Sequence, residues 1–328
     1  MNFQRLTTRE LREFENFSAR FAKAAKKSGI EDVQSYYELL YRSAVWIHRQ
    51  QDSVSPKVWV QGIAGGQGSG KSTFAGLLKL VLESVFDLRT LALSLDDFYL
   101  SYSDRQRLAE DVNPLLATRG VPGTHDVELM NEVINSICQG EETKIPRFDK
   151  ATDDRRQIPE VFNSTIDVLI IEGWCIGAKP YGESEDDQSL LRFPINKLEV
   201  DEDADGVWRN FVNEQLRSPG YQSLFRSLDA LFYLAVPDWD AVLRWRSLQE
   251  SRINSAVAIT GSVKMPADHG GFQIVGRESR IMDKAGIERF IMFYERITRK
   301  MLRDMPDVAD FTFNLNEAHQ FVSVIEKP

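Results

Sequence analysis

The chain contains little cysteine, with only Cys138 and Cys175 among its 328 residues. So few cysteines exclude a disulfide framework, and two isolated thiols make a poor metal site, so we expect both to be buried and free in a reducing compartment. The sequence also contains no apolar run as long as a membrane span. Its first residues, Met1 to Arg5, are polar and lack the apolar segment of a signal peptide. These absences indicate a soluble cytoplasmic protein.

Positive charge is in deficit. The chain has 40 lysines and arginines against 49 aspartates and glutamates, which gives a formal net charge of -9. This balance argues against nucleic acid or an anionic membrane as the main partner. An anionic substrate would have to be held by a local cluster of basic residues. The hydrophobic content of 42% is enough for the core of one large α/β domain or slightly more.

One glycine-rich segment dominates what is present. It matches the pattern G-x-x-x-x-G-K-[ST] and consists of Gly65, Gly66, Gln67, Gly68, Ser69, Gly70, Lys71, Ser72 and Thr73. A short apolar run at 58–63 precedes it, and apolar residues at helical spacing follow it from 74 to 85. Backbone N–H groups and the helix N-terminus would cradle phosphates, Lys71 would reach the β- and γ-phosphates, and Ser72 would hold Mg²⁺. The segment therefore predicts a site for ATP and Mg²⁺.

Apolar patterns along the chain predict alternating strands and helices. Strands are expected at 58–63, 90–95, 166–171, 230–236 and 311–315, and helices within 1–50 and at 73–86, 127–138, 239–253 and 288–305. This order predicts an α/β fold of the P-loop NTPase type, a three-layer αβα arrangement with a mostly parallel sheet. Residues 1–54 are expected to form an N-terminal helical extension, and residues 55–328 the P-loop domain. Acidic stretches at 183–187 and 199–205 are interpreted as solvated insertions, and the glycine-bearing segment 257–276 as a mobile loop.

Three acidic residues follow predicted strands. Ligands of open parallel sheets bind beyond the carboxyl ends of the strands. Asp96 ends the second strand, which is expected beside the strand that carries the P-loop, and its carboxylate could orient an attacking hydroxyl and accept its proton. Glu172 follows the third strand at the place of a Walker-B acid, and with Ser72 and Asp96 it is a candidate Mg²⁺ ligand. Asp97 is expected to cap a turn, a role that also stays open for Asp96.

These pieces together resemble the phosphoribulokinase, uridine kinase and pantothenate kinase group. The segment 93–99 is similar to the group's Asp-x-Phe-Tyr segment, and Ile171-Glu172-Gly173 to its Glu-Gly. Within the group, the sequence looks closest to the plant- and fungal-type D-glycerate 3-kinase family. Segments 119–126 (RGVPGTHD), 146–150 (PRFDK) and 172–177 (EGWCIG) carry that likeness, and 245–250 (WRSLQE) is a weaker match shifted by one residue. The likeness covers about 55–253, and not 1–50 or 257–285.

The resemblance implies roles for individual residues. It makes Asp96 the catalytic base, with Lys71 and Arg246 as further catalytic groups, and the acceptor site would be lined by Arg119, His125, Asp126, Arg147 and Asp149. Arginine offers a bidentate fork to a carboxylate, which agrees with an acidic acceptor. Other readings stay open: Asp126 as a helix cap, His125 as a loop histidine, and Arg147 paired with Asp149. Arg246 would lie in a lid around 238–285 that closes over the site.

The implied reaction is ATP-dependent phosphorylation of D-glycerate to 3-phosphoglycerate. ATP and Mg²⁺ would be the cofactors, a small hydroxy acid the partner, and the protein a monomer or homodimer. Pantothenate or a nucleoside remains possible as the acceptor. A non-catalytic ATP-binding regulatory protein is the alternative from another class.

Overall fold

The computed structural model describes residues 6–27, 33–182, 185–246, 248, 262–266, 272–276 and 284–327. Its centre is a six-stranded sheet in the order β12-β11-β8-β1-β7-β2. The strands are β1 (Trp59–Gly65), β2 (Thr90–Ser94), β7 (Val168–Gly173), β8 (Ala230–Ala235), β11 (Phe311–Leu315) and β12 (Phe321–Glu326). All neighbours pair in parallel except β12, which is antiparallel to β11. The five predicted strands are present, and β12 was missed.

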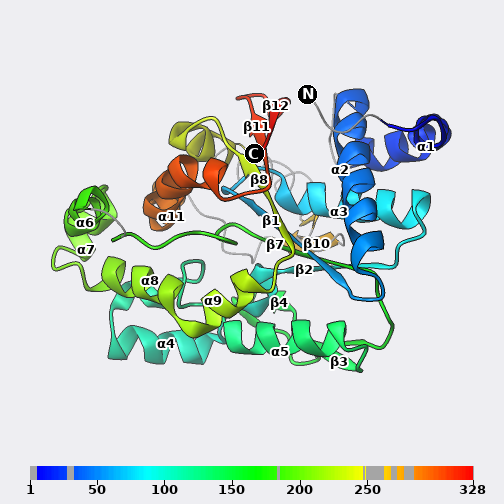
Figure 1. The fold of residues 1–328 in the computed structure, drawn as a ribbon. Coiled ribbons are helices and arrows are strands. Elements are labelled where there is room, and N and C mark those ends of the chain that lie inside the picture. The colour runs from blue at the N-terminus through cyan, green and yellow to red at the C-terminus, as the bar shows by residue number, and fades with distance from the viewer. Residues whose placement is uncertain are drawn as a thin grey trace.

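The central strands are buried on both faces. In β7, Val168 and Ile170 join one hydrophobic core, whereas Leu169 and Ile171 join the other. Helices cover both faces: α1 (Thr8–Lys27), α2 (Val33–Val54) and α3 (Lys71–Val85) on one, and mainly α5 (Val127–Cys138), α8 (Val207–Arg217), α9 (Pro219–Arg226) and α11 (Lys284–Asp304) on the other. Figure 1 shows α1–α3 on one side of the sheet and α5 and α9 on the opposite side. The predicted three-layer αβα fold is confirmed.

The N-terminal helices share a core with the P-loop helix. Tyr37 of α2 stacks on Phe14 of α1 with ring centroids 4.5 Å apart, and its hydroxyl donates to the Phe14 carbonyl. Trp46 of α2 meets Trp59 of β1 edge-on at 5.8 Å. These helices therefore complete one face of the sheet.

The acidic stretches at 183–187 and 199–205 were predicted to be solvated, and for three carboxylates this is wrong. Two short helices occupy this region, α6 (Glu185–Arg192) and α7 (Lys197–Glu202). Asp187, Glu199 and Asp203 are buried and pair with Lys300, Arg296 and Arg209, respectively. Asp187 and Glu199 look solvated in the sequence because their partners lie 113 and 97 residues away, whereas Asp203 pairs with Arg209 only six residues later.

The remaining elements are short. They are the helical turns η1 (Leu95–Phe98), η2 (Pro114–Ala117) and η3 (Met305–Asp307), helix α4 (Tyr102–Asp111), and the strand pairs β3 (Thr143–Ile145) with β6 (Glu160–Phe162), β4 (Phe148–Asp149) with β5 (Asp154–Arg155), and β9 (Ser262–Pro266) with β10 (Phe272–Gly276). The last pair corrects the predicted loop at 257–276, because ten of its residues form an antiparallel ladder. The helix predicted at 239–253 is seen over 239–246, and most of the predicted lid lies outside the described residues.

Two further predictions concern solvent and membrane. Both cysteines are free thiols, but only Cys175 is buried, since Cys138 ends α5 at the surface.

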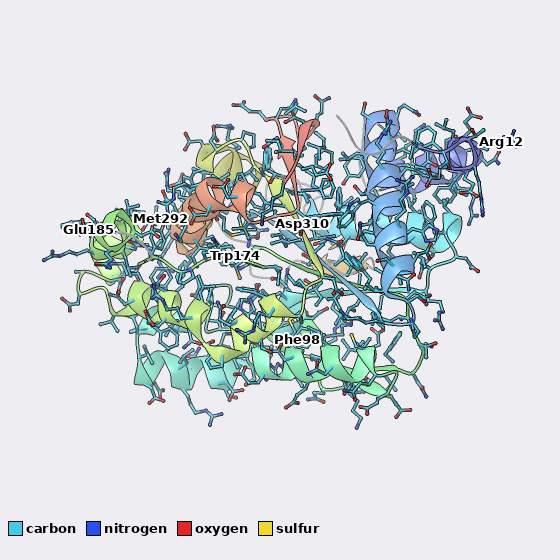
Figure 2. The ribbon with its side chains drawn as sticks, viewed as in Figure 1. Arg12, Phe98, Trp174, Glu185, Met292 and Asp310 are labelled. Atoms are coloured by element: carbon cyan, nitrogen blue, oxygen red, sulfur yellow. The ribbon has the colours of Figure 1, made fainter. Side chains whose placement is uncertain are left out.

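Figure 2 shows Trp174 and Phe98 inside the molecule, with Arg12 and Glu185 at its two ends. Among the helices that the structure describes, none has both the length and the hydropathy needed to cross a bilayer.

Candidate functional site

The carboxyl ends of three strands meet at one edge of the sheet. In the pairing register, Ile63 of β1 lies opposite Glu172 of β7, and Glu172 lies opposite Ser94 of β2. The P-loop leaves β1 two residues later, and Asp96 follows β2 by two residues. The expectation that β2 would neighbour the P-loop strand is wrong, because β7 lies between them. Glu172 therefore occupies the central position between the P-loop and Asp96.

The P-loop has the conformation that its glycines permit. Gly68 and Gly70 have φ angles of 80° and 82°, which side-chain-bearing residues rarely adopt. Gly70 is the N-cap of α3 and supplies no side-chain cap, so no side chain of the cap residue binds the first N–H groups of the helix. The Ser69 hydroxyl is buried and has no hydrogen-bond partner among the residues that the structure describes. This cradle of backbone donors fits a polyphosphate.

Ser72 and Glu172 bring two hard oxygen atoms together beside the P-loop. The Ser72 hydroxyl donates to Oε1 of Glu172 at 3.0 Å, and Glu172 is 2% exposed. No group of three or more histidine, cysteine, aspartate or glutamate residues suited to a metal occurs in the described part of the chain. Mg²⁺ in nucleotide sites is bound by one or two protein oxygens together with phosphates and water, so two ligands suffice. The residues present fit a nucleotide-bound Mg²⁺.

Asp96 lies in η1 with a basic partner that the sequence analysis had not singled out. Its Oδ2 accepts a hydrogen bond from Nζ of Lys150 at 2.8 Å, and its Oδ1 accepts one from the hydroxyl of Tyr99 at 2.7 Å. Burial alone would raise the pKa of Asp96, but the charges of Lys150 and Lys71, with the two hydrogen bonds, hold that pKa well below its usual range. Asp96 is therefore ionised, and the charge of Lys71 in the P-loop helps to stabilise its ionised form.

Asp97 and Arg147 form a buried ion pair. Nη1 of Arg147 lies 2.6 Å from Oδ2 of Asp97, and the Phe148 backbone N–H donates to Oδ1 at 3.2 Å. Two further donors of Arg147 bind Glu160. The turn-capping role predicted for Asp97 is wrong, and so is the suggested pair of Arg147 with Asp149. The role of Arg147 in acceptor binding stays a prediction, while its contact with Asp97 attaches β4 to the strand end that carries Asp96.

His125 and Arg119 lie beside Tyr99, the hydrogen-bond partner of Asp96. The His125 ring stacks on Tyr99 with centroids 4.7 Å apart, and its Nδ1 lies 2.8 Å from the Tyr221 hydroxyl. Burial lowers the pKa of His125 to about 4, against the opposing effect of Asp96. Arg119 pairs with Asp153 and lies over the ring of Phe148, 5.5 Å from its centroid. The site therefore combines a neutral imidazole with a guanidinium.

The carboxylates of Asp126 and Asp149 make different contacts. Asp126 is the N-cap of α5, because its side chain accepts the Leu129 N–H, and it also pairs with Arg155 at 2.9 Å. Asp149 accepts the backbone N–H of Ala151. The helix-cap reading of Asp126 is confirmed, and acceptor binding by either carboxylate stays a prediction.

Helix α11 contributes Tyr294, which the sequence analysis did not select. Its ring packs edge-on against Trp174 at 4.9 Å. Burial raises the pKa of Tyr294, and four charged groups lie near enough to modify it: Asp96, Arg119, Arg246 and Lys150. A Cβ at Gly120 would overlap the Tyr294 hydroxyl oxygen, so glycine is required there.

The guanidinium of Arg246 also contacts α11, and it lies 5.6 Å from the centroid of Phe290, one turn before Tyr294. A long-range contact like this leaves no local sequence signal.

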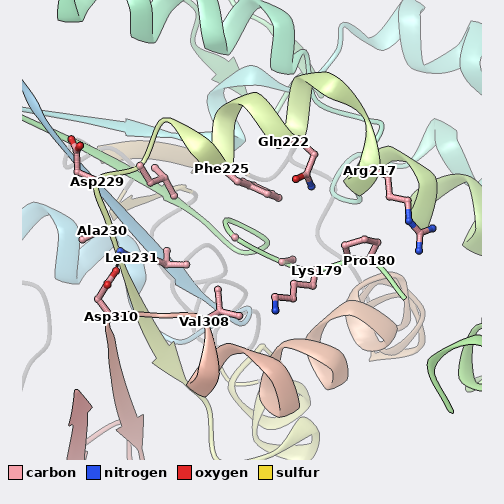
Figure 3. A pocket seen from close by; sticks show the side chains of 13 residues that line it. Lys179, Pro180, Arg217, Gln222, Phe225, Asp229, Ala230, Leu231, Val308 and Asp310 are labelled. Carbon is pink, nitrogen blue, oxygen red and sulfur yellow. Dashed lines mark hydrogen bonds between the residues drawn. The ribbon is translucent and has the colours of Figure 1, made fainter. Parts of the chain in front are cut away.

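A cavity of about 580 Å³ lies away from this site. It is lined by the first residues of β8, by α9 and by the segment 177–180, with Lys179 and Gln222 on its walls (Figure 3). Two of its carboxylates, Asp229 and Asp310, accept the backbone N–H groups of Val60 and Leu231. Because these groups lie at the amino ends of the strands, the cavity is at the sheet edge opposite the P-loop.

Comparison with known proteins agrees with this geometry. Residues 60–177 match the model of the phosphoribulokinase / uridine kinase family. An uncharacterized kinase of Schizosaccharomyces pombe is 31% identical over 244 residues, which cover 68% of this chain and 81% of that protein. The chloroplastic D-glycerate 3-kinase of Arabidopsis thaliana is 28% identical over 208 residues, which cover 60% of this chain but only 41% of the plant protein.

Solved structures extend the match to nearly the whole chain. A D-glycerate 3-kinase from Cryptococcus neoformans superimposes with a TM-score of 0.69 at 25% identity, over 88% of this chain and 99% of that one. The resemblance to plant and fungal D-glycerate 3-kinases that the sequence analysis stated is confirmed by the plant relative and by this structure.

Proposed function

The chain belongs to the phosphoribulokinase and uridine kinase family of P-loop kinases, and we propose that it transfers the γ-phosphoryl group of ATP to a hydroxyl of D-glycerate, giving 3-phosphoglycerate. One observation carries the choice of acceptor. Asp96 accepts hydrogen bonds from Lys150 and Tyr99, and the guanidinium of Arg119 lies over the ring of Phe148, which packs edge-on against Tyr99. A carboxylate that can bind a hydroxyl therefore lies close to a cation that can bind an acid group. This combination suits a small hydroxy acid.

Each residue has a role in the transfer. The P-loop N–H groups and Lys71 hold the β- and γ-phosphates and offset their charge. Ser72 and Glu172 would hold Mg²⁺, which would neutralise charge on the phosphate oxygens. The acceptor oxygen forms a bond to the γ-phosphorus, while the bond from that phosphorus to the β,γ-bridging oxygen breaks and its electrons stay with ADP. The hydroxyl proton passes to Asp96, whose ionised form orients the hydroxyl before transfer.

His125 and Arg119 would bind the acid. With its pKa near 4, His125 stays neutral at physiological pH and offers a hydrogen bond without a full charge. Arg119 provides the planar fork that matches a carboxylate, although one of its nitrogens is already paired with Asp153. Asp126, Arg147 and Asp149 complete the proposed acceptor set as the resemblance implies. In the proposed closed state, Arg246 stabilises the charge of the transferring group.

A nucleoside acceptor is less suited to these surroundings. A nucleobase would need an accessible aromatic face, and the two aromatic residues of the acceptor segments are both buried. Trp174 donates its indole N–H to the Gly120 carbonyl and packs against Tyr294, and Phe148 lies beneath Arg119. Their ring surfaces already have protein partners.

A product-resolved assay tests the proposal. Purified protein is incubated with ATP, Mg²⁺ and D-glycerate, with pantothenate, uridine and L-glycerate in parallel, and products are identified by ³¹P and ¹H NMR. We expect 3-phosphoglycerate rather than the 2-isomer, and none in the Lys71→Ala variant. Phosphorylation of pantothenate or uridine without D-glycerate would overturn the acceptor alone. ATP binding without turnover of any hydroxyl compound would favour the regulatory alternative.

A further inference from the structure

The carboxylate of Asp96 is bonded on both of its oxygens. Lys150 donates to Oδ2 at 2.8 Å and Tyr99 donates to Oδ1 at 2.7 Å. A carboxylate can accept about four hydrogen bonds, so each oxygen can still accept one from an acceptor hydroxyl. The two existing bonds prevent the carboxylate from rotating about its Cβ–Cγ bond. The direction in which Asp96 presents its lone pairs is therefore set by Lys150 and Tyr99.

These two partners differ in freedom. Tyr99 is buried, stacks on His125 and meets Phe148 edge-on at 5.1 Å, so its hydroxyl is fixed by packing. The side chain of Lys150 is 32% exposed and ends a flexible four-carbon stem. Tyr99 is thus the rigid partner of Asp96, and Lys150 is the adjustable and charged one.

A neighbouring ion pair brings Lys150 to Asp96. The buried Arg147–Asp97 pair and the bond from the Phe148 N–H to Asp97 attach β4 to η1. Lys150 follows β4 directly, and Asp96 directly precedes Asp97. The same two segments therefore make two acid–base contacts, one buried beneath the site and one facing it. The buried Arg147–Asp97 pair therefore affects the site, because it fixes the distance between Lys150 and Asp96.

We propose that Lys150 is a positioning residue that directs the Asp96 carboxylate toward the acceptor hydroxyl, while Tyr99 holds the opposite oxygen. The proposal rests on the proposed kinase function and adds a residue to it. The bonds formed and broken are those given above, and the hydroxyl proton still goes to Asp96. Lys150 acts through Asp96, so its loss should misalign the carboxylate, and misplacement near 1 Å can cost a factor of about 100 in rate.

Steady-state kinetics of two substitutions test the role. Lys150→Met removes the ammonium but keeps a long side chain, and we expect kcat to fall about 10- to 100-fold with the KM for ATP changed less than about twofold. Lys150→Arg retains a charged donor and should recover kcat to within about fivefold of wild type. Lys144→Met, at an exposed lysine on β3, is the matched control and should be unchanged. Circular dichroism and thermal unfolding establish that each variant folds, and Lys150→Gln replaces Lys150→Met if that variant does not.

A double-mutant cycle decides whether Lys150 acts through Asp96. If it does, adding Lys150→Met to Asp96→Asn should lower kcat by less than about threefold, because the carboxylate is already gone. The proposal is overturned if the two losses multiply, if folded Lys150→Met keeps wild-type kcat, or if its defect is confined to the KM for ATP.

The test of Lys150 does not depend on D-glycerate being the acceptor. If wild-type protein does not phosphorylate D-glycerate, the substrate assignment fails, and the same variants are compared with whichever hydroxyl compound the screen identifies. If no hydroxyl compound reacts, they are compared in the slower transfer to water, where Asp96 would orient the attacking molecule in the same way. A normal rate for Lys150→Met in that reaction contradicts the positioning role.

Discussion

Glu172 illustrates at the scale of one residue how a buried charge can serve a ligand. It lies inside the sheet edge with 2% exposure, and its Oε1 accepts a hydrogen bond from Ser72. We expect Glu172→Gln to raise the Mg²⁺ concentration for half-maximal activity about 10- to 100-fold, the usual effect of losing a group that supports a metal. A Mg²⁺ titration of turnover at saturating ATP measures this. Glu83→Gln, on the exposed side of α3, is the control, and an unchanged Mg²⁺ requirement for Glu172→Gln would exclude the metal role.

Arg147 allows a structural role to be separated from substrate binding. Its side chain is 9% exposed and that of Asp97 is 3% exposed, so Arg147→Ala leaves a buried carboxylate without its cation. Breaking such a pair costs about 3 to 5 kcal/mol in unfolding free energy. Urea unfolding should show this loss, whereas Arg107→Ala, at a residue 72% exposed and paired with Asp104, should change stability by less than about 1 kcal/mol. A normal stability with a raised KM for the acid would instead establish Arg147 as an acceptor ligand.

His125 should make stability depend on pH in a defined window. Its pKa is about 4 in the folded protein, against the ordinary histidine value of 6.5 that applies to the unfolded chain, so the unfolded chain binds the proton more readily. Stability therefore rises with pH between about 4 and 6.5, and His125 contributes no further change below or above that window. Between pH 7 and pH 4, wild type should lose about 3 kcal/mol more than His125→Gln, at 1.36 kcal/mol for each pKa unit. Denaturant unfolding at several pH values measures the difference, and parallel pH profiles would contradict the assignment.

At the scale of elements, α7 offers a comparison of two glutamates on one helix. Glu199 is fully buried against Arg296, whose guanidinium also donates to the carbonyls of Leu190 and Phe193, whereas Glu202 pairs with Arg289 at the surface. We expect Glu199→Ala to lower the unfolding free energy by about 3 to 5 kcal/mol, because Arg296 stays buried without its counter-ion. Glu202→Ala should cost less than about 1 kcal/mol. Equal effects of the two substitutions, measured by urea unfolding, would mean that this pair does not hold α6 and α7 on α11.

The elements that the sequence predicts are those with a local cause. The run before Gly65 and the spacing from Phe74 to Val85 depend on neighbours in the sequence, and β1 and α3 are found where expected. The docking of α7 depends on Arg296, which lies 97 residues from Glu199. The partner of Asp97 is 50 residues away, so local rules favoured a capping role instead. Long-range ion pairs explain the errors at Asp187, Glu199 and Asp97.

The same distinction applies to the site as a whole. The P-loop, Asp96 and Glu172 were identified because each follows a strand, and parallel strands bring their carboxyl ends together whatever the sheet order. The order of the strands was predicted wrongly at one place, because β2 was expected beside β1 and β7 lies between them. Lys150 and Tyr294 come from a short hairpin and a distant helix, and only the folded chain brings them near Asp96.

The whole molecule should respond to nucleotide through contacts that connect the P-loop to two other elements. Nε2 of His319, in the turn after β11, lies 3.0 Å from the Gly68 carbonyl oxygen, and its ring stacks on Trp245 of the helical residues 239–246. MgATP at about a hundred times its Kd should raise the unfolding free energy by about 2.7 kcal/mol in wild type. Lys71→Ala should show a much smaller rise at the same concentration, because a charge on the phosphates is lost.

Hydrogen exchange locates that stabilisation. With a non-hydrolysable ATP analogue and acceptor, we expect slower exchange in the P-loop, in the turn around His319 and in residues 239–246, where the predicted lid begins. Trp245→Ala should weaken the protection of residues 239–246 while leaving that of the P-loop, because Trp245 both lies against Gly68 and stacks on His319. Protection confined to the P-loop and α3 in wild type would contradict a lid in this region. Protection of residues 239–246 that survives in Trp245→Ala would mean that the lid is coupled to the nucleotide by another route.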